Sequence, residues 1–452
     1  MQITFLGAAQ TVTGSRFLLK LEEKNILIDC GLFQGLKELR RRNWEPFPIP
    51  PNQIDIIILT HAHIDHTGYL PLLIKNGFKG KVLCSDATRD LCEILLPDSG
   101  YLQEEEAKFA NKYGYSKHRP AEPLYTRVDA EKCLKYLKAL PFRKNYKISD
   151  STSMMLIPAG HILGAAIVQI RHYETTVLFS GDLGRPEDPI MYPPAIMQAA
   201  DYMILESTYG DRLHQKKDPL DELTEIIHRT AEQGGTVIIP AFAVGRAQHL
   251  LYMMYQLKIQ KRIPDLPIYL DSPMARNATD IFRKYTSLHR LGEEMSQRVC
   301  EVAMYVNTKE ESQAIDLETR SKIIISASGM LEGGRVLHHI RRFASDEKNT
   351  IVFAGYQAAG TRGADMIAGK ESIRLFGEVI PVRAKIEVLS NMSAHADYEE
   401  ILQWLSHFNH PPRKIFITHG ETGAAESLKN KIHERYGWTC VVPKYMQVDS
   451  LG

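Results

Sequence analysis

The chain has 452 residues, of which 44% are hydrophobic, and this length and composition predict two or three globular domains. Its 55 basic and 54 acidic residues leave a net charge of +1, which excludes a bulk positive field for nucleic acid, so any attraction for phosphate must be local. The six cysteines lie far apart and form no C-x-x-C pair, which argues against a disulfide scaffold or a zinc ribbon and suits a reducing cytosol.

The N-terminal segment MQITFLGAAQ has no basic region and is typical of a strand, so we expect no signal peptide. No apolar run approaches the roughly 18 residues that a membrane span requires. We therefore expect a cytoplasmic protein with no membrane partner.

The first part of the chain, up to about residue 207, is predicted to begin with short β-strands at QITFLG, SRFLLKL and NILIDC. A buried strand is predicted at residues 55–60 (DIIILT), followed by a helix over 66–77 that ends at Gly77. Residues 86–140 are charged and are predicted to be helical, most clearly at YLQEEEAKFANKYG. Strands are expected again at MMLIPAG, AIVQIRHY, TVLFSGD and YMILEST.

After residue 208 the pattern changes to helices that alternate with strands ending in small residues. The predicted helices and strands are, in order, LDELTEIIHRTAEQ, GTVIIPAFA, GRAQHLLYMMYQLK, PIYLDSP, a further helical stretch, KIIISAS, RVLHHIRRF and NTIVFAGY. This alternation predicts a parallel sheet. The tail is predicted to add strand AKIEVLS, helix DYEEILQWLSHF and strand RKIFITHG.

Side chains that can bind metals follow apolar strands four times. DIIILT is followed by His61, MMLIPAG by His161, TVLFSG by Asp182, and KIFIT by His419. Because a sheet holds the ends of its strands in place while the adjoining loops stay open, such positions favour a functional site.

The densest cluster is LTHAHIDHTG, which holds His61, His63, Asp65 and His66 within six positions. An exposed polar loop is the alternative interpretation, but the apolar strand that precedes the cluster favours a site.

The strand-end residues and this cluster together can be assigned to two metal ions. His61, His63 and His161 would hold one ion, while Asp65, His66 and His419 would hold the second. Asp182 would bridge the two ions. Such nitrogen and oxygen donors suit zinc, with manganese or iron as alternatives. Two ions roughly 3.5–4 Å apart can share a hydroxide and clamp a phosphoryl group, which predicts an anionic substrate.

The H-x-H-x-D-H pattern, with a distant His, Asp and His, resembles the metallo-β-lactamase superfamily. ILESTYGDR, SAHAD and ITHGE resemble the three additional motifs of the β-CASP nucleases, and PAFAVGRAQ, YLDSPMA, SASGML and GGRVLHHI extend the resemblance over nearly the whole chain. The most similar group is that of the bacterial and archaeal RNA-cleaving enzymes, which are related to the endonuclease subunit of the cleavage-and-polyadenylation machinery.

The resemblance implies an α/β fold. An αββα metallo-β-lactamase sandwich would comprise residues 1–207 and 384–452, and a parallel α/β β-CASP domain would be inserted over 208–383. RNA would bind in the cleft between the two lobes. The chain begins at the first strand and ends 33 residues after His419, so we expect neither an N-terminal RNA-binding module nor a C-terminal dimerisation domain. The oligomeric state stays open.

The resemblance also implies a zinc-dependent ribonuclease that hydrolyses single-stranded RNA, internally, by means of a metal-bridging hydroxide. Asp65, Glu206 and His395 would be its catalytic residues, with His395 as a general acid that Glu206 holds in place. Asp29, in ILIDCG, would support the ligand loop without binding metal; a plain turn aspartate is the alternative.

Candidate substrate contacts have less support. Ser393, two residues before His395, would bond a phosphate oxygen or be purely structural. Ser328 and Gly329, in SASGMLEGGR, would cradle a phosphate with backbone N–H groups or simply form a turn. KELRRR (residues 37–42) would contact RNA or form a solvated face. We treat the remaining histidines, such as His118, His172, His214 and His249, as structural.

Several rival functions stay open. A 5′–3′ exoribonuclease of the same family, a metallo-β-lactamase-fold hydrolase of a small substrate, a non-catalytic RNA-binding subunit and a DNA-processing enzyme are the alternatives. All seven ligand positions are filled, which argues for catalysis.

Overall fold

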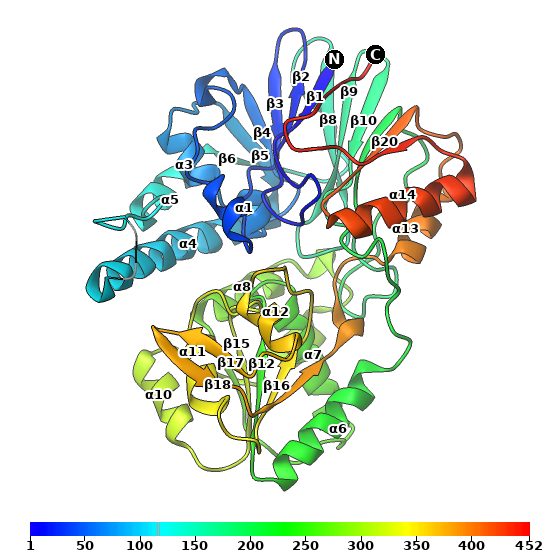
Figure 1. Ribbon diagram of the computed structural model, residues 1–452. Coiled ribbons are helices and arrows are strands. Elements are labelled where there is room, and N and C mark those ends of the chain that lie inside the picture. The colour runs from blue at the N-terminus through cyan, green and yellow to red at the C-terminus, as the bar shows by residue number, and fades with distance from the viewer. Residues whose placement is uncertain (115, 117) are drawn as a thin grey trace. The chain divides into compact units, whose positions relative to one another are not determined.

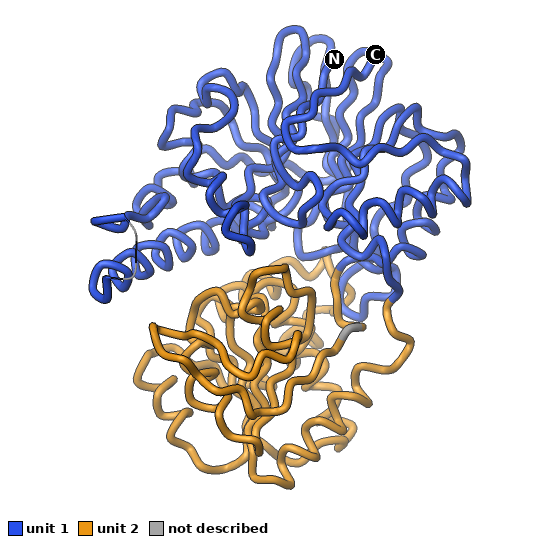
Figure 2. Tube along the Cα trace, in the orientation of Figure 1, with its two compact units in different colours: residues 1–213, 395–452 blue, residues 214–394 orange. Residues whose placement is uncertain are grey.

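The computed structural model describes residues 1–114, 116 and 118–452. The chain divides into two compact units, unit 1 with residues 1–213 and 395–452, and unit 2 with residues 214–394 (Figure 2). The junctions predicted from sequence lie at 207/208 and 383/384, whereas the units divide at 213/214 and 394/395. The second junction is later because the strand within 384–390 pairs in the sheet of unit 2.

Unit 1 contains two seven-stranded sheets that face each other (Figure 1). The strands of the first sheet, in spatial order, are β22 (Val448–Ser450), β1 (Gln2–Phe5), β2 (Phe17–Lys20), β3 (Asn25–Ile28), β4 (Ile56–Ile58), β5 (Lys81–Ser85) and β6 (Leu137–Leu140). Those of the second sheet are β21 (Cys440–Val441), β20 (Lys414–Thr418), β11 (Tyr202–Glu206), β10 (Thr175–Phe179), β9 (Ala166–His172), β8 (Thr152–Pro158) and β7 (Tyr146–Lys147).

The core of unit 1 lies between these two sheets. Phe5 of the first sheet lies 5.1 Å from Phe416 of the second, and Phe17 lies 6.2 Å from Phe179, measured between ring centroids. All four rings belong to one buried cluster that both sheets supply. Burial of these apolar faces is the main force that holds the sheets together.

Helices cover the outer faces of the sandwich. In Figure 1, α3, α4 and α5 lie on the side of the first sheet, and α13 and α14 lie on the side of the second. The helices of unit 1 are α1 (Lys37–Arg41), α2 (Ile64–Thr67), α3 (Leu70–Lys75), α4 (Asp86–Tyr113), α5 (Arg127–Cys133), α13 (Tyr398–Leu405) and α14 (Thr422–Tyr436), with short 3₁₀ turns at Pro51–Gln53 and Leu134–Tyr136. The predicted αββα sandwich is therefore confirmed.

Two helix predictions in unit 1 are corrected. The single helix expected over 66–77 is two helices, α2 and α3, because the N–H of Tyr69 donates to the carbonyl of Cys30 instead of continuing the helix. The helical segment expected over 86–140 ends in strand β6, which pairs in parallel with β5. Tyr115 and Lys117, within that segment, lie outside the described residues.

Unit 2 is built on a six-stranded parallel sheet, as predicted. Its strands, in spatial order, are β14 (Met304–Tyr305), β13 (Ile268–Asp271), β15 (Lys322–Ser326), β12 (Thr236–Pro240), β16 (Thr350–Phe353) and β19 (Lys385–Val388). A separate hairpin joins β17 (Ser372–Leu375) to β18 (Glu378–Pro381). The helices are α6 (Pro219–Glu232), α7 (Arg246–Ile259), α8 (Pro273–Lys284), α9 (Glu293–Cys300), α10 (Lys309–Leu317), α11 (Val336–Phe343) and α12 (Arg362–Ile367), with 3₁₀ turns at Thr286–Leu288 and Ser390–Met392.

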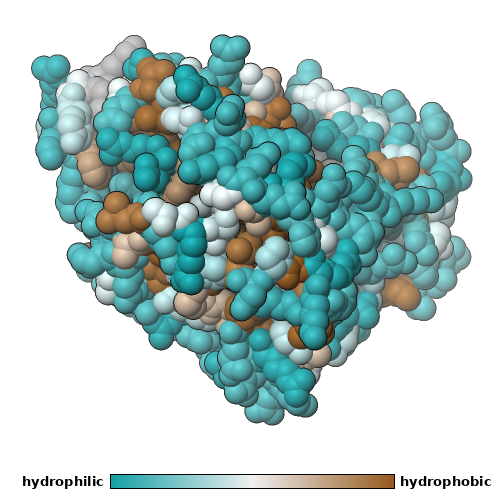
Figure 3. Space-filling model, turned by 90° about the horizontal axis from the view of Figure 1, so that it is seen from below, coloured by the Kyte–Doolittle hydropathy of each residue, from teal (hydrophilic) through white to brown (hydrophobic). Residues whose placement is uncertain are grey.

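The surface is mainly polar on the face drawn in Figure 3, where hydrophobic residues lie in small groups among hydrophilic ones. Within the part of the chain that the structure describes, none of the helices combines the length and the apolar character that a membrane span needs.

Candidate metal centre

The predicted ligands of unit 1 meet at one edge of the sandwich, because the strands before them end there. His61 follows β4, His161 follows β8, Asp182 follows β10 and His419 follows β20. The strands expected before these four residues are all confirmed. The structure therefore brings together side chains that are up to 358 positions apart in the sequence.

One group of ligand atoms comes from His61, His63, His161 and Asp182, which offer donors within 4.8 Å of one another. Nε2 of His61 lies 3.1 Å from Nδ1 of His63, which lies 3.4 Å from Nε2 of His161. Three imidazoles bound tetrahedrally to zinc would have nitrogens about 3.3 Å apart, given Zn–N bonds of about 2.0–2.1 Å. The spacing of this group therefore fits a shared ion.

A second group consists of Asp65, His66 and His419. Nε2 of His66 lies 3.1 Å from Nε2 of His419, which lies 3.4 Å from Oδ2 of Asp65. Asp65 and His66 are on the single turn of α2, and His63 is the N-cap residue just before it. This short turn lets neighbouring residues of the H-x-H-x-D-H motif serve both groups.

Asp182 lies between the two groups. Its Oδ2 is 3.4 Å from Nε2 of His61 and 3.5 Å from Nε2 of His161, whereas its Oδ1 is 3.3 Å from Nε2 of His66 and 3.7 Å from Nδ1 of His419. Each oxygen of the carboxylate thus faces a different set of imidazoles, which is the geometry that a bridging ligand requires.

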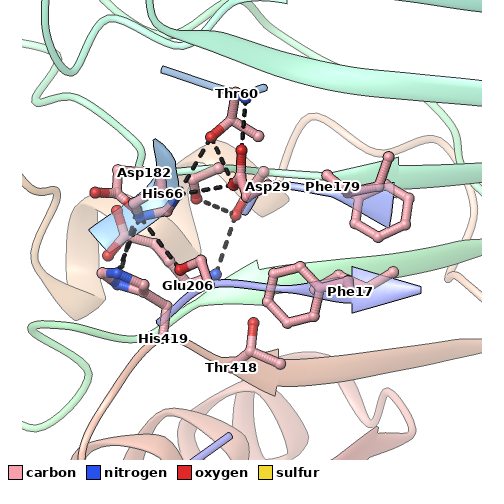
Figure 4. A pocket seen from close by; sticks show the side chains of 14 residues that line it. Phe17, Asp29, Thr60, His66, Phe179, Asp182, Glu206, Thr418 and His419 are labelled. Carbon is pink, nitrogen blue, oxygen red and sulfur yellow. Dashed lines mark hydrogen bonds and ion pairs between the residues drawn. The ribbon is translucent and has the colours of Figure 1, made fainter. Parts of the chain in front are cut away.

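Hydrogen bonds to the other ring nitrogen orient three of the imidazoles. Nδ1 of His66 is 2.7 Å from Oδ2 of Asp29, and Nδ1 of His61 is 3.1 Å from the hydroxyl of Thr60. Asp29 also accepts hydrogen bonds from the N–H and hydroxyl of Thr60, as Figure 4 shows. These partners leave Nε2 of both histidines to face the metal site.

Thr208 does the same for His419, because its hydroxyl lies 3.0 Å from Nδ1 of that ring. Sequence reasoning missed Thr60 and Thr208. Thr60 directly precedes His61, and Thr208 lies in the ESTYG motif, so proximity to a recognised motif was the signal available for both.

Two residues of the site have backbone angles in the left-handed region, Asp29 with φ 59° and His419 with φ 47°. Residues other than glycine rarely adopt this conformation, and where it occurs the surrounding structure must hold it. The N–H of His419 donates to the carbonyl of Ala8, and that of Asp29 donates to the carbonyl of Ile58.

His395 and Glu206 form a pair beside the ligands. Nδ1 of His395 lies 3.1 Å from both oxygens of Glu206 and 4.0 Å from Oδ2 of Asp182. Glu206 also accepts a hydrogen bond of 2.6 Å from the N–H of Leu183, which fixes its carboxylate. The imidazole of His395 is therefore held in place through Nδ1.

The charges of the site are strongly coupled. Burial alone would raise the pKa of Asp182, but the imidazoles around it, His419 and His66 foremost, hold that pKa well below its usual value. Burial alone would lower the pKa of His66, but the carboxylates of Asp182, Asp29 and Asp65 raise it well above its usual value. Asp182 is thus held as the anion, the form that binds a metal.

Burial would also lower the pKa of His395, but Glu206 and Asp182 outweigh it and raise that pKa to about 9. Cations bound beside Asp182 would act in the opposite direction.

These residues fit zinc. The imidazole nitrogens have the spacing of ligands to a shared ion, and imidazole with carboxylate is a donor set that zinc prefers. Oδ1 of Asp182 is buried and lies 3.3 Å from Nε2 of His66, but it accepts no well-formed hydrogen bond from the described residues. A cation would compensate this oxygen, which would otherwise be costly to bury.

Comparison with known proteins gives three family profiles that match successive parts of the chain. The metallo-beta-lactamase superfamily matches residues 12–224, the Beta-Casp domain matches 247–366, and the Zn-dependent metallo-hydrolase RNA specificity domain matches 379–443. Ribonuclease TTHA0252 of Thermus thermophilus is 37% identical over 93% of this chain and 93% of its own length. The chain belongs to the β-CASP family of metallo-β-lactamase RNA nucleases.

Other β-CASP relatives cover the chain equally well. Transcription termination factor FttA of Methanosarcina mazei is 32% identical over 96% of this chain and 69% of its own length. Integrator complex subunit 11 of Danio rerio is 28% identical over 98% of this chain and 73% of its own length. A crystal structure of an Enterococcus faecalis protein of unknown function shares the fold, with a TM-score of 0.53, 14% identity and 99% coverage of both chains.

The predicted substrate contacts of this β-CASP nuclease, Ser328, Gly329 and Ser393, belong to unit 2, whereas the predicted metal ligands belong to unit 1. Ser393 is buried. The hydroxyl of Ser328 accepts a hydrogen bond from the N–H of Glu332, and the carbonyl of Gly329 accepts one from the side chain of Gln357. The loop after β15 is thus held by its own hydrogen bonds, and its role in binding phosphate stays a prediction.

Proposed function

We propose that this RNA nuclease is an endonuclease that hydrolyses phosphodiester bonds of single-stranded RNA with two zinc ions. The observation that carries the proposal is the position of Asp182, whose two oxygens face different imidazole groups while the Glu206–His395 pair lies beside it. A site that can hold two cations next to a positioned imidazole suits cleavage of a phosphodiester.

His61, His63 and His161 would hold one ion, Asp65, His66 and His419 the other, and Asp182 both, with manganese or iron as alternative metals. When bound, such ions supply Lewis acidity that polarises phosphoryl oxygens and makes water nucleophilic near neutral pH. Asp29 would support this set by fixing the ring of His66, to which it is hydrogen-bonded.

The chain's own side chains would handle the protons. Asp65 is the most solvent-exposed carboxylate of the cluster, with 21% of its side chain accessible against 2% for Asp182, so it can take the proton of the attacking water. As the bond from phosphorus to the departing ribose oxygen breaks, Nε2 of His395 would donate a proton to that oxygen. Glu206 would hold Nδ1 and so keep Nε2 directed outward.

Contacts to the RNA backbone would come from Ser393 and from the loop with Ser328 and Gly329. Hydroxyl groups and backbone N–H groups commonly donate hydrogen bonds to phosphate oxygens. If they serve this role, Ser328→Ala should raise KM for RNA and leave kcat nearly unchanged, because it would remove binding common to ground state and transition state.

A circular single-stranded RNA tests the endonucleolytic action, since only an endonuclease can open a circle. We expect the metal-loaded protein to linearise it and Asp182→Ala to leave it intact. Degradation of a linear RNA with a 5′ phosphate while the circle survives would instead establish the second candidate, a 5′–3′ exoribonuclease of the same family.

A further inference from the structure

The segment that follows Asp29 is attached directly to the loop that carries the metal ligands. The N–H of Cys30 donates to the carbonyl of His66, and that of Leu32 donates to the carbonyl of Ile64. A Cβ added at Gly31 would lie 1.6 Å from the carbonyl oxygen of Asp65, so the two backbones are in close contact. Whatever this segment carries is therefore held in a fixed position relative to the metal centre of unit 1.

The same segment continues into α1, and Asn43, which follows α1, bonds back to the backbone of Phe33, which precedes it. The side chain of Asn43 accepts a hydrogen bond from the N–H of Phe33 and donates one of 2.7 Å to its carbonyl. Arg16, which is buried, donates to both the carbonyl of Gly31 and Oδ1 of Asn43. Residues 34–42 therefore form a loop that is closed and anchored at its base.

The outer surface of this anchored loop carries exposed basic side chains and an exposed tryptophan. Lys37, Arg40 and Arg41 are exposed, and none of the three forms an ion pair with another described residue. Their spacing of three and four places them on one face of the helix. Trp44, seven positions after Lys37, is 61% exposed and makes no ring contact within the described residues. We call Lys37, Arg40, Arg41 and Trp44 the α1 platform.

An exposed tryptophan on a rigid base is unusual, because leaving so large an apolar ring in water forfeits the free energy of its burial. The segment 36–45 holds four basic and two acidic residues, whereas the whole chain has a net charge of only +1. Arg42, the fourth basic residue, is not part of the platform, since its guanidinium packs 4.0 Å above the ring of Tyr445. The platform thus combines local positive charge with a free aromatic face.

We propose that the α1 platform binds the single-stranded RNA substrate, with one base stacked on Trp44 and backbone phosphates paired with Lys37, Arg40 and Arg41. Aromatic faces beside clustered cations are the usual means of binding single strands without sequence preference. This inference rests on the proposed function and extends it by naming where unit 1 holds RNA away from the scissile bond. A protein partner of the same face is the outcome that the experiment must separate from it.

Binding can be measured directly with an oligouridylate of about 20 nucleotides labelled at one end, by fluorescence anisotropy, on metal-loaded protein in a His395→Ala background that slows cleavage. Trp44→Ala should weaken binding roughly 10-fold or more, since loss of one stacked base has that effect. Replacing Lys37, Arg40 and Arg41 together by alanine should weaken binding and lower the slope of log Kd against log salt by about two.

Matched controls exist within unit 1. Tyr173 is 62% exposed, so Tyr173→Ala removes an equally accessible aromatic ring. Lys20, Lys79 and Lys81 are exposed, so their joint replacement by alanine removes the same charge elsewhere. Both controls should bind the oligouridylate as the parent protein does. A base stacked on Trp44 should also quench its fluorescence. The change can be assigned to Trp44, because Trp404 is buried and Trp438 is half-buried. Trp44→Phe should abolish that quenching yet bind RNA nearly normally.

If both platform variants bind the oligouridylate as tightly as the parent protein, or if the platform and control variants weaken binding equally, the proposal is wrong. The α1 platform would then be assigned to a protein partner. Cleavage of bis(p-nitrophenyl) phosphate separates this failure from failure of the proposed function. If the parent protein hydrolyses neither this diester nor RNA, the proposed catalytic function is wrong. The anisotropy result still decides whether the platform binds RNA. In an active protein, platform variants should lose more turnover on RNA than on the small diester.

Discussion

Nδ1 of His395 lies 3.1 Å from each carboxylate oxygen of Glu206, so the pair is symmetric and leaves only Nε2 of the imidazole for other chemistry. The proposed general acid follows from this relationship. His395→Ala should keep both metals and still bind RNA, yet cleave it roughly 10²–10⁴-fold more slowly. The rate constant for cleavage under single-turnover conditions measures this loss.

The control for this prediction is the leaving group. A phosphodiester whose leaving group is nitrophenolate needs no protonation, so His395→Ala should recover much of its rate on that substrate. An equal loss of rate on both substrates would contradict the role of His395 as an acid.

Asp182→Ala should lose metal and activity together, because the two oxygens of this side chain face both imidazole groups. Elemental analysis of purified protein should give about two zinc-like ions per chain for the wild type and fewer for the variant. Full activity in a metal-free Asp182→Ala protein would refute the dinuclear site.

His419→Ala should lose one ion and retain the other, because Nε2 of His419 belongs to the group with His66 and Asp65. His395→Ala serves as the matched control, since it lies in the same C-terminal part of unit 1 but is bonded to Glu206. Metal counts with the opposite pattern, one ion lost from His395→Ala and none from His419→Ala, would reverse the assignments of the two histidines.

Gly31→Ala should destabilise unit 1 and lower its metal content, because the new Cβ would collide with the carbonyl of Asp65. We expect a loss of about 3 kcal/mol in the free energy of unfolding, measured in urea. Gly423→Ala is the control, since that glycine lies in α14 with open space around its Cβ position and alanine there should be neutral or slightly stabilising. Similar effects of the two variants would contradict the close contact.

Unit 2 should lose stability at alkaline pH. His339 is buried between Asp271 and Asp316, with its two ring nitrogens 2.8 and 2.7 Å from their oxygens. Burial alone would lower the pKa of His339, but these hydrogen-bonded carboxylates raise it from 6.5 to about 9. A group whose pKa is raised by folding stabilises the folded state fully below its unfolded pKa and loses that contribution as pH rises through about 9.

The free energy of unfolding should fall by about 3 kcal/mol between pH 6 and pH 10. Urea unfolding monitored by circular dichroism measures this change. The glutamine side chain in His339→Gln cannot be protonated. The variant should therefore be less stable than the wild type at pH 6, and its stability should vary less with pH. Parallel pH curves for the wild type and His339→Gln would show that this histidine is not the titrating group. Arg335, which donates to Asp271, is present in both proteins and cancels in the comparison.

Much of the site was determined by local sequence pattern. Apolar runs such as those before His61, His161 and His419 favour strands, and a ligand-type residue just after such a run is placed at the end of its strand, although all three histidines remain buried. The spacing in H-x-H-x-D-H likewise permits two ligand groups on one short turn. For these residues the strand assignments and the motif are enough to predict that the side chains meet.

Tertiary structure alone decided the rest, because long-range contacts override local preference. The helix expected over 66–77 breaks at Tyr69, whose N–H finds a partner in Cys30, 39 positions away, which no local pattern reveals. The end of the segment 86–140 becomes a strand only because β5 offers an edge to pair with. Thr208 acquires its role from His419, 211 positions away. Burial and hydrogen bonding between distant segments, rather than propensity, therefore set the orientation of the side chains on which the proposed chemistry depends.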